Sequence, residues 1–109
     1  MADRETYSDL IRLHILHHAV EEPVYGLWII EELQRHGYRL SAGTLYPLLH
    51  RMEKRGYLES FKKRSDGRVR RFYRATSEGR AALADAKRKV QELFGELFEN
   101  DSRRRGGKH

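Results

Sequence analysis

The chain contains no cysteine and no long apolar run, and both absences narrow the functions to consider. Without cysteine it has neither disulfide bonds nor thiolate metal sites, which agrees with a cytoplasmic protein. No stretch of about 18 apolar residues occurs and no charged-then-apolar leader opens the chain, so nothing indicates membrane insertion or secretion. The 109 residues predict one small domain that is marginally stable as a monomer, because such a chain buries only about 60 to 65% of its unfolded surface.

Motifs for catalysis are missing as well. No nucleophile stands beside a base and an orienting acid, and no Gly-rich phosphate loop is present, so we predict neither an enzyme nor a cofactor. His14, His17 and His18 have a spacing that can hold a metal ion between one pair. No carboxylate or cysteine clearly completes the set nearby, so we interpret them as ordinary surface or interface histidines and predict no metal site.

Positive charge is concentrated in one part of the chain. Residues 51–75 hold ten Lys and Arg against three Asp and Glu, whereas residues 1–50 carry a net charge of −3. An isolated basic run is usually only a solvated surface. This run coincides with an expected helix end and hairpin, and that coincidence favours nucleic acid as the partner.

The segment 37–59 contains the most informative helix. Its apolar residues fall at i, i+3, i+4 and i+7 and form one stripe, made of Leu45, Leu48, Leu49 and Met52. The opposite face is lean in acid and has small residues at its N-terminal end, where the backbone can approach a phosphate closely.

Individual residues also indicate where this helix begins and ends. Ser41 is the expected N-cap. Pro47 lacks the N–H that would bond to the carbonyl of Gly43, so we expect a distorted or late first turn and a regular helix over residues 44–55. Gly56 is the expected C-terminal cap.

Two strands are expected next, over residues 57–64 and 68–74, with Asp66-Gly67 in the turn between them. A helix pair followed by a basic hairpin is the winged helix-turn-helix arrangement, in which the third helix enters the major groove and the hairpin touches the neighbouring backbone or minor groove. The residues expected to contact double-stranded DNA are Ser41, Thr44, Tyr46, His50, Arg51, Lys54, Lys62, Lys63, Arg64 and Arg68.

Two further helices precede this segment, over residues 6–21 and 25–36, separated by Glu22-Pro23-Val24. In the second of them we expect three apolar residues to face inward, namely Leu27, Ile30 and Leu33.

A last helix is expected over residues 77–99, with Thr76 as its N-cap. Apolar residues recur along it at spacings of three and four, which is typical of a heptad seam for a partner helix. Folding back onto its own domain is the alternative. The expected dimerisation residues are Leu83, Ala86, Val90, Leu93, Phe94, Leu97 and Phe98.

The chain resembles the PadR family of transcriptional regulators over about residues 10–98. The motifs that carry the resemblance are Tyr25-Gly26, His36-Gly37-Tyr38, Gly43-Thr44-Leu45-Tyr46-Pro47-Leu48-Leu49, Glu53, Gly56, Arg71-Phe72-Tyr73 and Thr76-Ser77-Glu78-Gly79. The resemblance implies homodimeric repressors that bind operator DNA through the winged helix, many of them responding to small aromatic effectors. This chain resembles the shorter branch, which has a single long C-terminal helix.

An effector site is the least specific of these expectations. Trp28, Phe94 and Phe98 are candidates because flat ligands bind by stacking and by filling apolar pockets. Core packing is the commoner role of such residues. Members of the short branch can carry a tryptophan on the last helix, where this chain has phenylalanine.

The sequence therefore predicts a mostly α protein with a small β hairpin. Residues 6–75 would form a winged helix-turn-helix DNA-binding domain, residues 76–99 a dimerisation helix, and residues 100–109 a disordered basic tail. A repressor that binds DNA as a homodimer is the favoured function, and a winged-helix module for protein interaction is the alternative.

Overall fold

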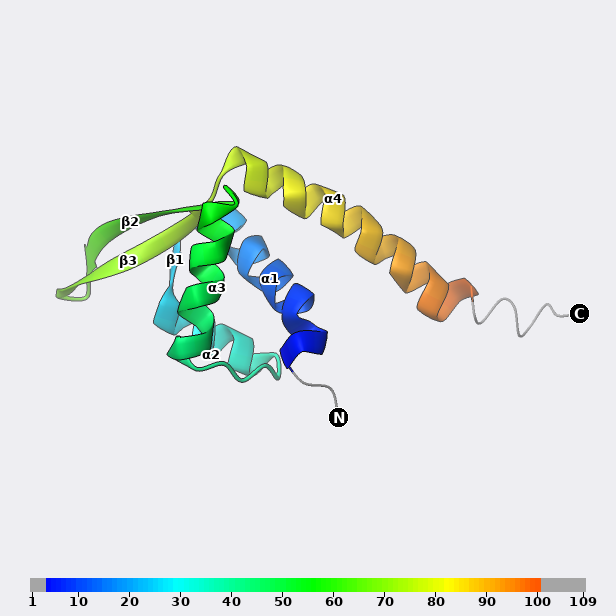
Figure 1. The fold of residues 1–109 in the computed structure, drawn as a ribbon, viewed down its shortest axis with the longest axis horizontal. Helices are drawn as coiled ribbons and strands as arrows, with labels where there is room; N and C mark the ends of the chain where they lie inside the picture. Colours follow the sequence, from blue (N-terminus) through cyan, green and yellow to red (C-terminus); the bar gives the residue numbers. More distant parts are fainter. Residues whose placement is uncertain (1–3, 101–109) are drawn as a thin grey trace, which may run out of the picture.

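The computed structural model describes residues 4–100, and the side-chain surroundings of residues 7–99. A body of three helices carries a projecting hairpin on one side and a long helical arm on the other (Figure 1). The expected basic tail lies outside the described residues, apart from the backbone of residue 100. The elements in chain order are α1 (Arg4–Glu21), β1 (Val24–Tyr25), α2 (Gly26–Arg35), α3 (Ala42–Lys54), β2 (Leu58–Ser65), β3 (Arg68–Ala75), α4 (Ser77–Phe94) and a terminal π-helix η1 (Gly95–Asn100).

The core lies between the three helices of the body and the base of the sheet. Tyr73 of β3 and Leu45 and Leu49 of α3 have no exposed surface. The stripe predicted on α3 is confirmed, because Leu48 and Met52 are buried with them. The predicted fold class is confirmed too. None of the described helices combines the length and the apolar character needed to cross a membrane.

The apolar face of α2 differs from the prediction. Leu27 is 50% exposed, whereas Ile29 and Leu33 are buried, so the inward assignment of Leu27 was wrong. Ile30 is partly buried, as predicted. The helix begins at Gly26 and turns the side of Gly26, Ile29 and Leu33 toward the core. Gly26 lies against the ring of Tyr46 of α3, where an added Cβ would collide, and the spacing of large apolar residues does not reveal this contact.

α3 begins at Ala42, two residues earlier than predicted, with Ser41 as its N-cap. The first turn is regular because its backbone bonds, such as the 2.9 Å bond from the N–H of Leu45 to the carbonyl of Ser41, do not involve Pro47. Gly56 follows the helix at φ 88°, a left-handed conformation that glycine adopts without a steric penalty, and it forms the expected C-terminal cap.

The sheet is antiparallel with strand order β1-β3-β2. Asp66 and Gly67 both have positive φ, 53° and 80°, as the two central residues of a type I′ hairpin turn require. The predicted hairpin, which we call the wing, is therefore confirmed. The sequence did not predict β1, in which Tyr25 pairs with Phe72.

α4 leaves the body in a direction fixed at its first turn. Thr76 caps the helix as predicted, accepting a 3.0 Å hydrogen bond from the N–H of Gly79, and its hydroxyl also donates to the carbonyl of Gly56. A Cβ added at Gly79 would lie 2.2 Å from the carbonyl oxygen of Tyr57. This contact explains why a glycine stands where a capping box would have a carboxylate.

Replacing Gly79 by alanine is expected to destabilise the fold. Alanine favours an isolated helix by about 1 kcal/mol over glycine, but the added methyl collides with a backbone atom, and overpacking costs about 1 to 3 kcal/mol or more. The cost of overpacking should exceed the gain in helix propensity, so we expect Gly79→Ala to lower the free energy of unfolding, measured with urea. Gly43→Ala is the matched control, because its Cβ would find only Ser41 Oγ, 3.7 Å away. A Gly79→Ala protein as stable as the unaltered chain would show that the contact at Tyr57 is not tight.

The end of α4 departs from the predicted regular helix. The α-helix stops at Phe94, and residues 95–100 form the wider turns of a π-helix. A heptad pattern assumes 3.5 to 3.6 residues per turn. The heptad register that the sequence predicted is therefore interrupted after Phe94.

Candidate nucleic-acid interface

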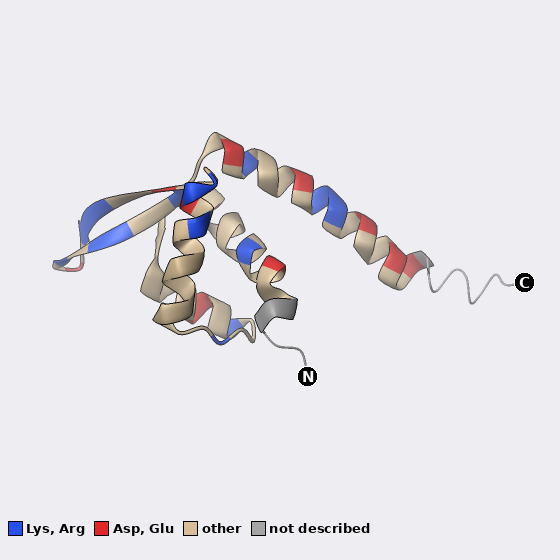
Figure 2. Ribbon diagram, viewed as in Figure 1, with Lys and Arg blue, Asp and Glu red and all other residues tan. Residues whose placement is uncertain are grey.

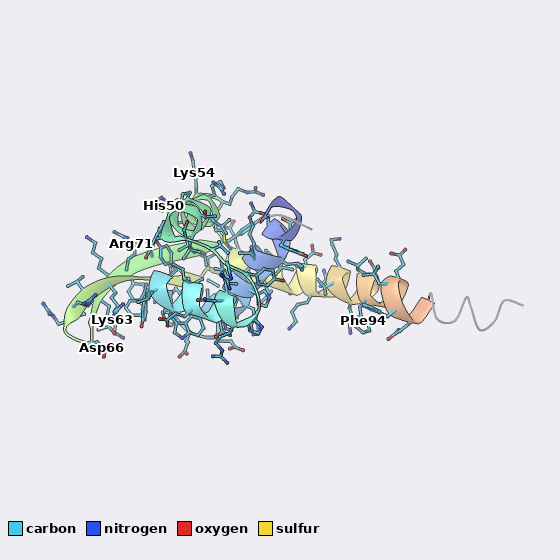
Figure 3. The ribbon with its side chains drawn as sticks, turned by 90° about the horizontal axis from the view of Figure 1, so that it is seen from below. His50, Lys54, Lys63, Asp66, Arg71 and Phe94 are labelled. Carbon is cyan, nitrogen blue, oxygen red and sulfur yellow. The ribbon has the colours of Figure 1, made fainter. Side chains whose placement is uncertain are left out.

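The outer face of α3 presents most of the residues predicted to contact DNA. Ser41, His50, Arg51 and Lys54 are exposed, and Thr44 is half-buried. Figure 3 shows His50 and Lys54 projecting from the same side of the molecule. The structure thus separates this polar face from the buried stripe, and the contacts with DNA stay predictions.

The start of α3 is open enough for a phosphate to approach. Ala42 and Gly43 are exposed and offer little side-chain bulk. Ser41 Oγ accepts a hydrogen bond from the N–H of Thr44, and the two hydroxyl groups lie 3.3 Å apart. Backbone N–H groups at a helix N-terminus attract anions, so this end of α3 suits a backbone phosphate.

Tyr46 is held against α2 and does not project freely. A Cβ built on Gly26 would lie 2.0 Å from the Tyr46 hydroxyl, so glycine at this position makes room for the tyrosine ring. The side chain is 38% exposed. Tyr46 therefore couples α2 to α3, and only part of its ring is accessible to a ligand.

The four basic residues predicted at the tip of the wing divide between its two faces. In the antiparallel register Lys62 pairs with Arg71, while Lys63 lies on the adjacent rung. Successive residues of a strand point to opposite faces, and paired residues point to the same face. Lys62 and Arg64 therefore share one face, and Lys63 and Arg68 share the other.

Arg71 was not among the predicted contacts, yet it lies on the wing face that continues the surface of α3. Its Nη1 donates to Ser60 Oγ at 3.0 Å, and that hydroxyl donates to Glu53 Oε2 of α3 at 2.8 Å. Figure 3 shows Arg71 on the side of the wing where His50 and Lys54 lie. The two-residue turn fixes the register, so the sequence contained the signal that pairs Arg71 with Lys62.

On the opposite face of the wing, Lys63 and Arg70 lie over aromatic rings. Lys63 Nζ lies 5.8 Å from the ring centre of Phe72, and the guanidinium of Arg70 lies 4.3 Å from that of Tyr25. The ring of Phe61 stacks on that of Phe72, with ring centres 5.8 Å apart. These contacts brace the wing against β1, so Lys63 is a weaker candidate for a phosphate contact than Lys62.

The charge on the α3 side favours an anionic partner. In Figure 2 the basic segments follow the wing and the last turns of α3. Beneath α3, burial raises the pKa of the Tyr73 hydroxyl. That hydroxyl has no hydrogen-bond partner among the described residues. It therefore stays neutral at physiological pH and adds no negative charge beneath this surface.

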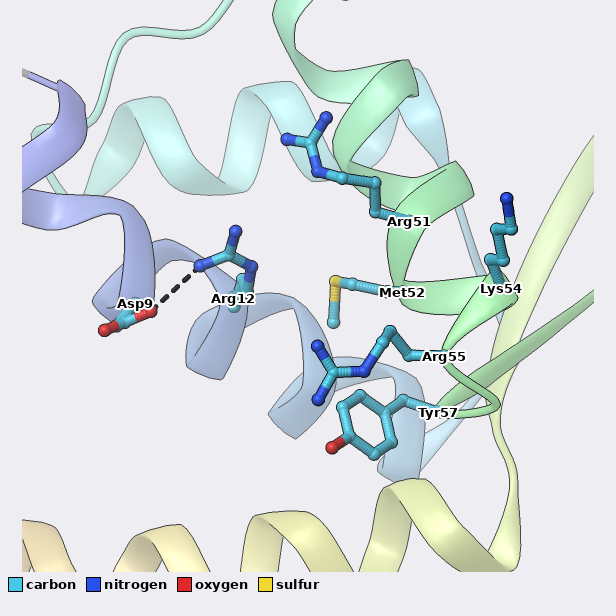
Figure 4. A pocket seen from close by; sticks show the side chains of 7 residues that line it. All are labelled: Asp9, Arg12, Arg51, Met52, Lys54, Arg55 and Tyr57. Atoms are coloured by element: carbon cyan, nitrogen blue, oxygen red, sulfur yellow. Dashed lines mark hydrogen bonds and ion pairs between the residues drawn. The ribbon is translucent and has the colours of Figure 1, made fainter.

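A basic hollow of about 570 Å³ adjoins the last turns of α3 on the side away from the wing (Figure 4). Arg12 of α1 borders it and is paired with Asp9 at 2.8 Å. Arg55 also lines it and lies over the ring of Tyr57, 5.6 Å from its centre. Its full lining is Asp9, Arg12, Arg51, Met52, Lys54, Arg55 and Tyr57. The hollow extends the cationic surface beyond the residues that the sequence predicted.

The predicted dimerisation residues fall into two groups. Leu83 and Ala86 are half-buried, and Leu83 packs on the core of its own chain. The first half of α4 thus folds back on the body, as the alternative interpretation had it. On the second half of α4 and in η1, five apolar residues are between 45% and 59% exposed: Val90, Leu93, Phe94, Leu97 and Phe98.

The three candidate effector residues do not line one cavity within the chain. Trp28 packs against His18 with ring centres 5.1 Å apart. The rings of Phe94 and Phe98 have centres 4.9 Å apart. Phe94 borders an apolar cavity of about 480 Å³ among the described residues, and neither Trp28 nor Phe98 lines that cavity. Leu13 of α1 and Val90 are among the other residues that line it.

Comparisons with known proteins agree with this arrangement. Residues 15–85 match the transcriptional regulator PadR-like family. A transcriptional regulator of Mycobacterium tuberculosis is 52% identical over 103 residues, which cover 94% of this chain and 96% of the relative.

Solved structures are similar as well. A PadR-like transcriptional regulator from Bacillus cereus superposes with a TM-score of 0.80 at 29% identity, covering 85% of this chain and 92% of that one. A PadR family transcriptional regulator from Eggerthella lenta gives 0.70 at 29% identity, covering 87% and 88%.

Proposed function

Because the chain belongs to the PadR-like family of transcriptional regulators, which are DNA-binding proteins and not enzymes, we propose that it is a repressor that binds an inverted-repeat operator as a homodimer. The observation that carries this proposal is the cationic surface to which both α3 and the wing contribute. His50 and Lys54 of α3 and Arg71 of β3 project on one side of the molecule (Figure 3). A module for protein interaction would need no such coincidence of charge with helix and wing.

In the proposed complex α3 occupies the major groove and the wing follows the adjacent backbone. Residues 6–75 then form the DNA-binding unit, and residues 76–99 the dimerisation helix. The bidentate donors of Arg71 and the ammonium group of Lys62 lie on the wing face beside α3 and contact phosphates. The basic hollow adds phosphate contacts through Arg55.

The proposed dimer covers the exposed half of α4. Apolar side chains at five positions near the end of α4 and in η1 are half exposed. Pairing with a second chain would remove them from water, and a chain this small gains stability from such burial. Two winged helices held this way would present reading helices about 34 Å apart, or a multiple of that, which matches an inverted repeat.

We also propose that a small aromatic effector releases the repressor from DNA in the cytoplasm. The support is the apolar cavity between α1 and α4, which Phe94 borders. A ligand there would lie against both the body and the arm of the protein. It would thereby change the angle of the arm and the spacing of the two reading helices.

The wing provides a direct test of DNA binding. Replacing Lys62 and Arg64 together by alanine should flatten the dependence of log K on log salt by about 2 units, because each phosphate that is no longer neutralised reduces the slope by roughly 0.9. The matched control is the double replacement of Lys63 and Arg68, which removes the same charge from the other face of the wing. Its slope should change by less than half as much. Equal changes of the salt slope in the two double variants, or no change in either, would contradict the assignment of Lys62 and Arg64 to the DNA-facing side of the wing.

A further inference from the structure

The densest group of titratable side chains away from α3 lies where α1 packs on α2. It contains His14, His17, His18 and Glu21 of α1, together with His36 beyond the end of α2. Glu32 of α2 is 3.5 Å from the Nε2 of His18 and 3.1 Å from that of His36. None of these groups belongs to the DNA surface described above.

Three of these side chains converge as metal ligands do. One potential ligand atom each from His17, His18 and Glu21 lies within 4.8 Å of the other two. His17 Nε2 and Glu21 Oε2 are already 3.7 Å apart. From the sequence we predicted no metal site, because no carboxylate clearly completed the set. Glu21, one helical turn after His17, supplies that carboxylate.

The geometry needs only small side-chain movements to accept an ion. Zinc binds imidazole and carboxylate at about 2.0 to 2.2 Å, which places tetrahedral ligand atoms about 3.4 Å apart. His17 and Glu21 are both exposed, so their side chains can rotate to close the remaining distance without disturbing the core.

A neighbouring carboxylate orients the third ligand. Metal-binding histidines usually donate their second ring N–H to a carboxylate, which fixes the ring. Glu32 stands in that position beside His18, and its side chain is 13% exposed. Because Arg35 and His36 also contact Glu32, it is a positioning group and not a ligand.

We propose that His17, His18 and Glu21 bind a divalent first-row transition metal ion, with Zn²⁺ as the reference ion. Two imidazoles and one carboxylate are the donor set that suits zinc, and three protein ligands leave a fourth position for water or another donor. The surface of α1 is then a metal site separate from the DNA-binding face.

Calorimetric titration of the full chain with ZnCl₂ tests the site. One Zn²⁺ should bind per chain, and His17→Ala or Glu21→Gln should each weaken binding on the order of tenfold or more. Both side chains are exposed, so both variants should keep the fold, which circular dichroism verifies. His50→Ala and His109→Ala are the controls, and each should bind zinc as the unaltered chain does.

Trp28 supplies an independent readout, because it is the only tryptophan and its ring lies 5.1 Å from that of His18. Cu²⁺ binds such sites more tightly than zinc and quenches nearby fluorescence, so one equivalent should quench Trp28. His17→Ala should require on the order of ten times more Cu²⁺ for the same quenching. Zinc and copper titrations that are unchanged in His17→Ala and Glu21→Gln, or binding that disappears only in His109→Ala, would overturn the proposal.

Discussion

Replacing Leu93 by aspartate is expected to turn the proposed dimer into monomers and to lower operator affinity on the order of a hundredfold or more, because a single half-site loses the gain from bivalent binding. Leu93 is 49% exposed on the part of α4 that extends beyond the body. In a dimer its side chain would be buried twice, once per chain. An unpaired carboxylate in that apolar contact is costly enough to separate the chains.

Light scattering at micromolar concentration and titration with operator duplex measure the two effects. Ala84→Asp is the matched control, since it adds the same charge at an exposed position of α4 outside the seam. It should remain dimeric with nearly unchanged affinity. If Leu93→Asp stays dimeric and binds the operator normally, the interface lies elsewhere, and α1, with Leu10 45% exposed, is the next surface to vary.

Replacing His50 by alanine is expected to reduce the preference for operator over random DNA. His50 is exposed on the outer face of α3, in the same helix as the partly covered Tyr46. A good base contact is worth about 1 to 3 kcal/mol of discrimination, so the affinity ratio should fall by roughly five- to 150-fold. Competition binding with the two duplexes measures that ratio.

Lys54→Ala separates base reading from phosphate binding. Lys54 lies one helical turn beyond His50 on the same side of α3 (Figure 3). A phosphate contact carries no sequence information, so this variant should weaken binding to both duplexes equally. A His50→Ala protein that also loses affinity equally on both would make His50 a positioning contact.

The parts of the fold that the sequence predicted are those determined by local patterns. The stripe of α3 follows from helical periodicity, and Asp66-Gly67 from the positive φ angles of its turn type. Thr76 was recognisable as a cap because its side chain bonds a backbone group only three residues away. Each of these features depends on a few neighbouring residues.

The parts that were missed depend on contacts between distant residues. β1 has only two residues and exists because it pairs with β3, with Val24 opposite Tyr73. Leu27 was placed inward because the contact of Gly26 with Tyr46 is not visible in the spacing of apolar residues. The sequence shows glycine at position 79, but the reason for it, the carbonyl of Tyr57, lies on another segment.

In the candidate DNA-binding site, too, local patterns were predictable from the sequence and contacts between distant segments were not. Exposure of His50 and Lys54 follows from the phase of one helix. The division of the wing cations requires the pairing of two strands, which places Lys62 opposite Arg71. Arg55 joins the basic surface only because the end of α3 packs near α1, where Arg12 borders the same hollow.

The most direct test of sequence-specific binding begins by selecting bound duplexes from a random pool. The affinity of the protein for the selected sequence is then compared with its affinity for a scrambled duplex of equal length, at one fixed salt concentration. We predict an inverted repeat and an affinity ratio of about 10³ or more. Selection of no common sequence, with equal affinity for both duplexes, would contradict it and leave a protein that binds DNA without reading it.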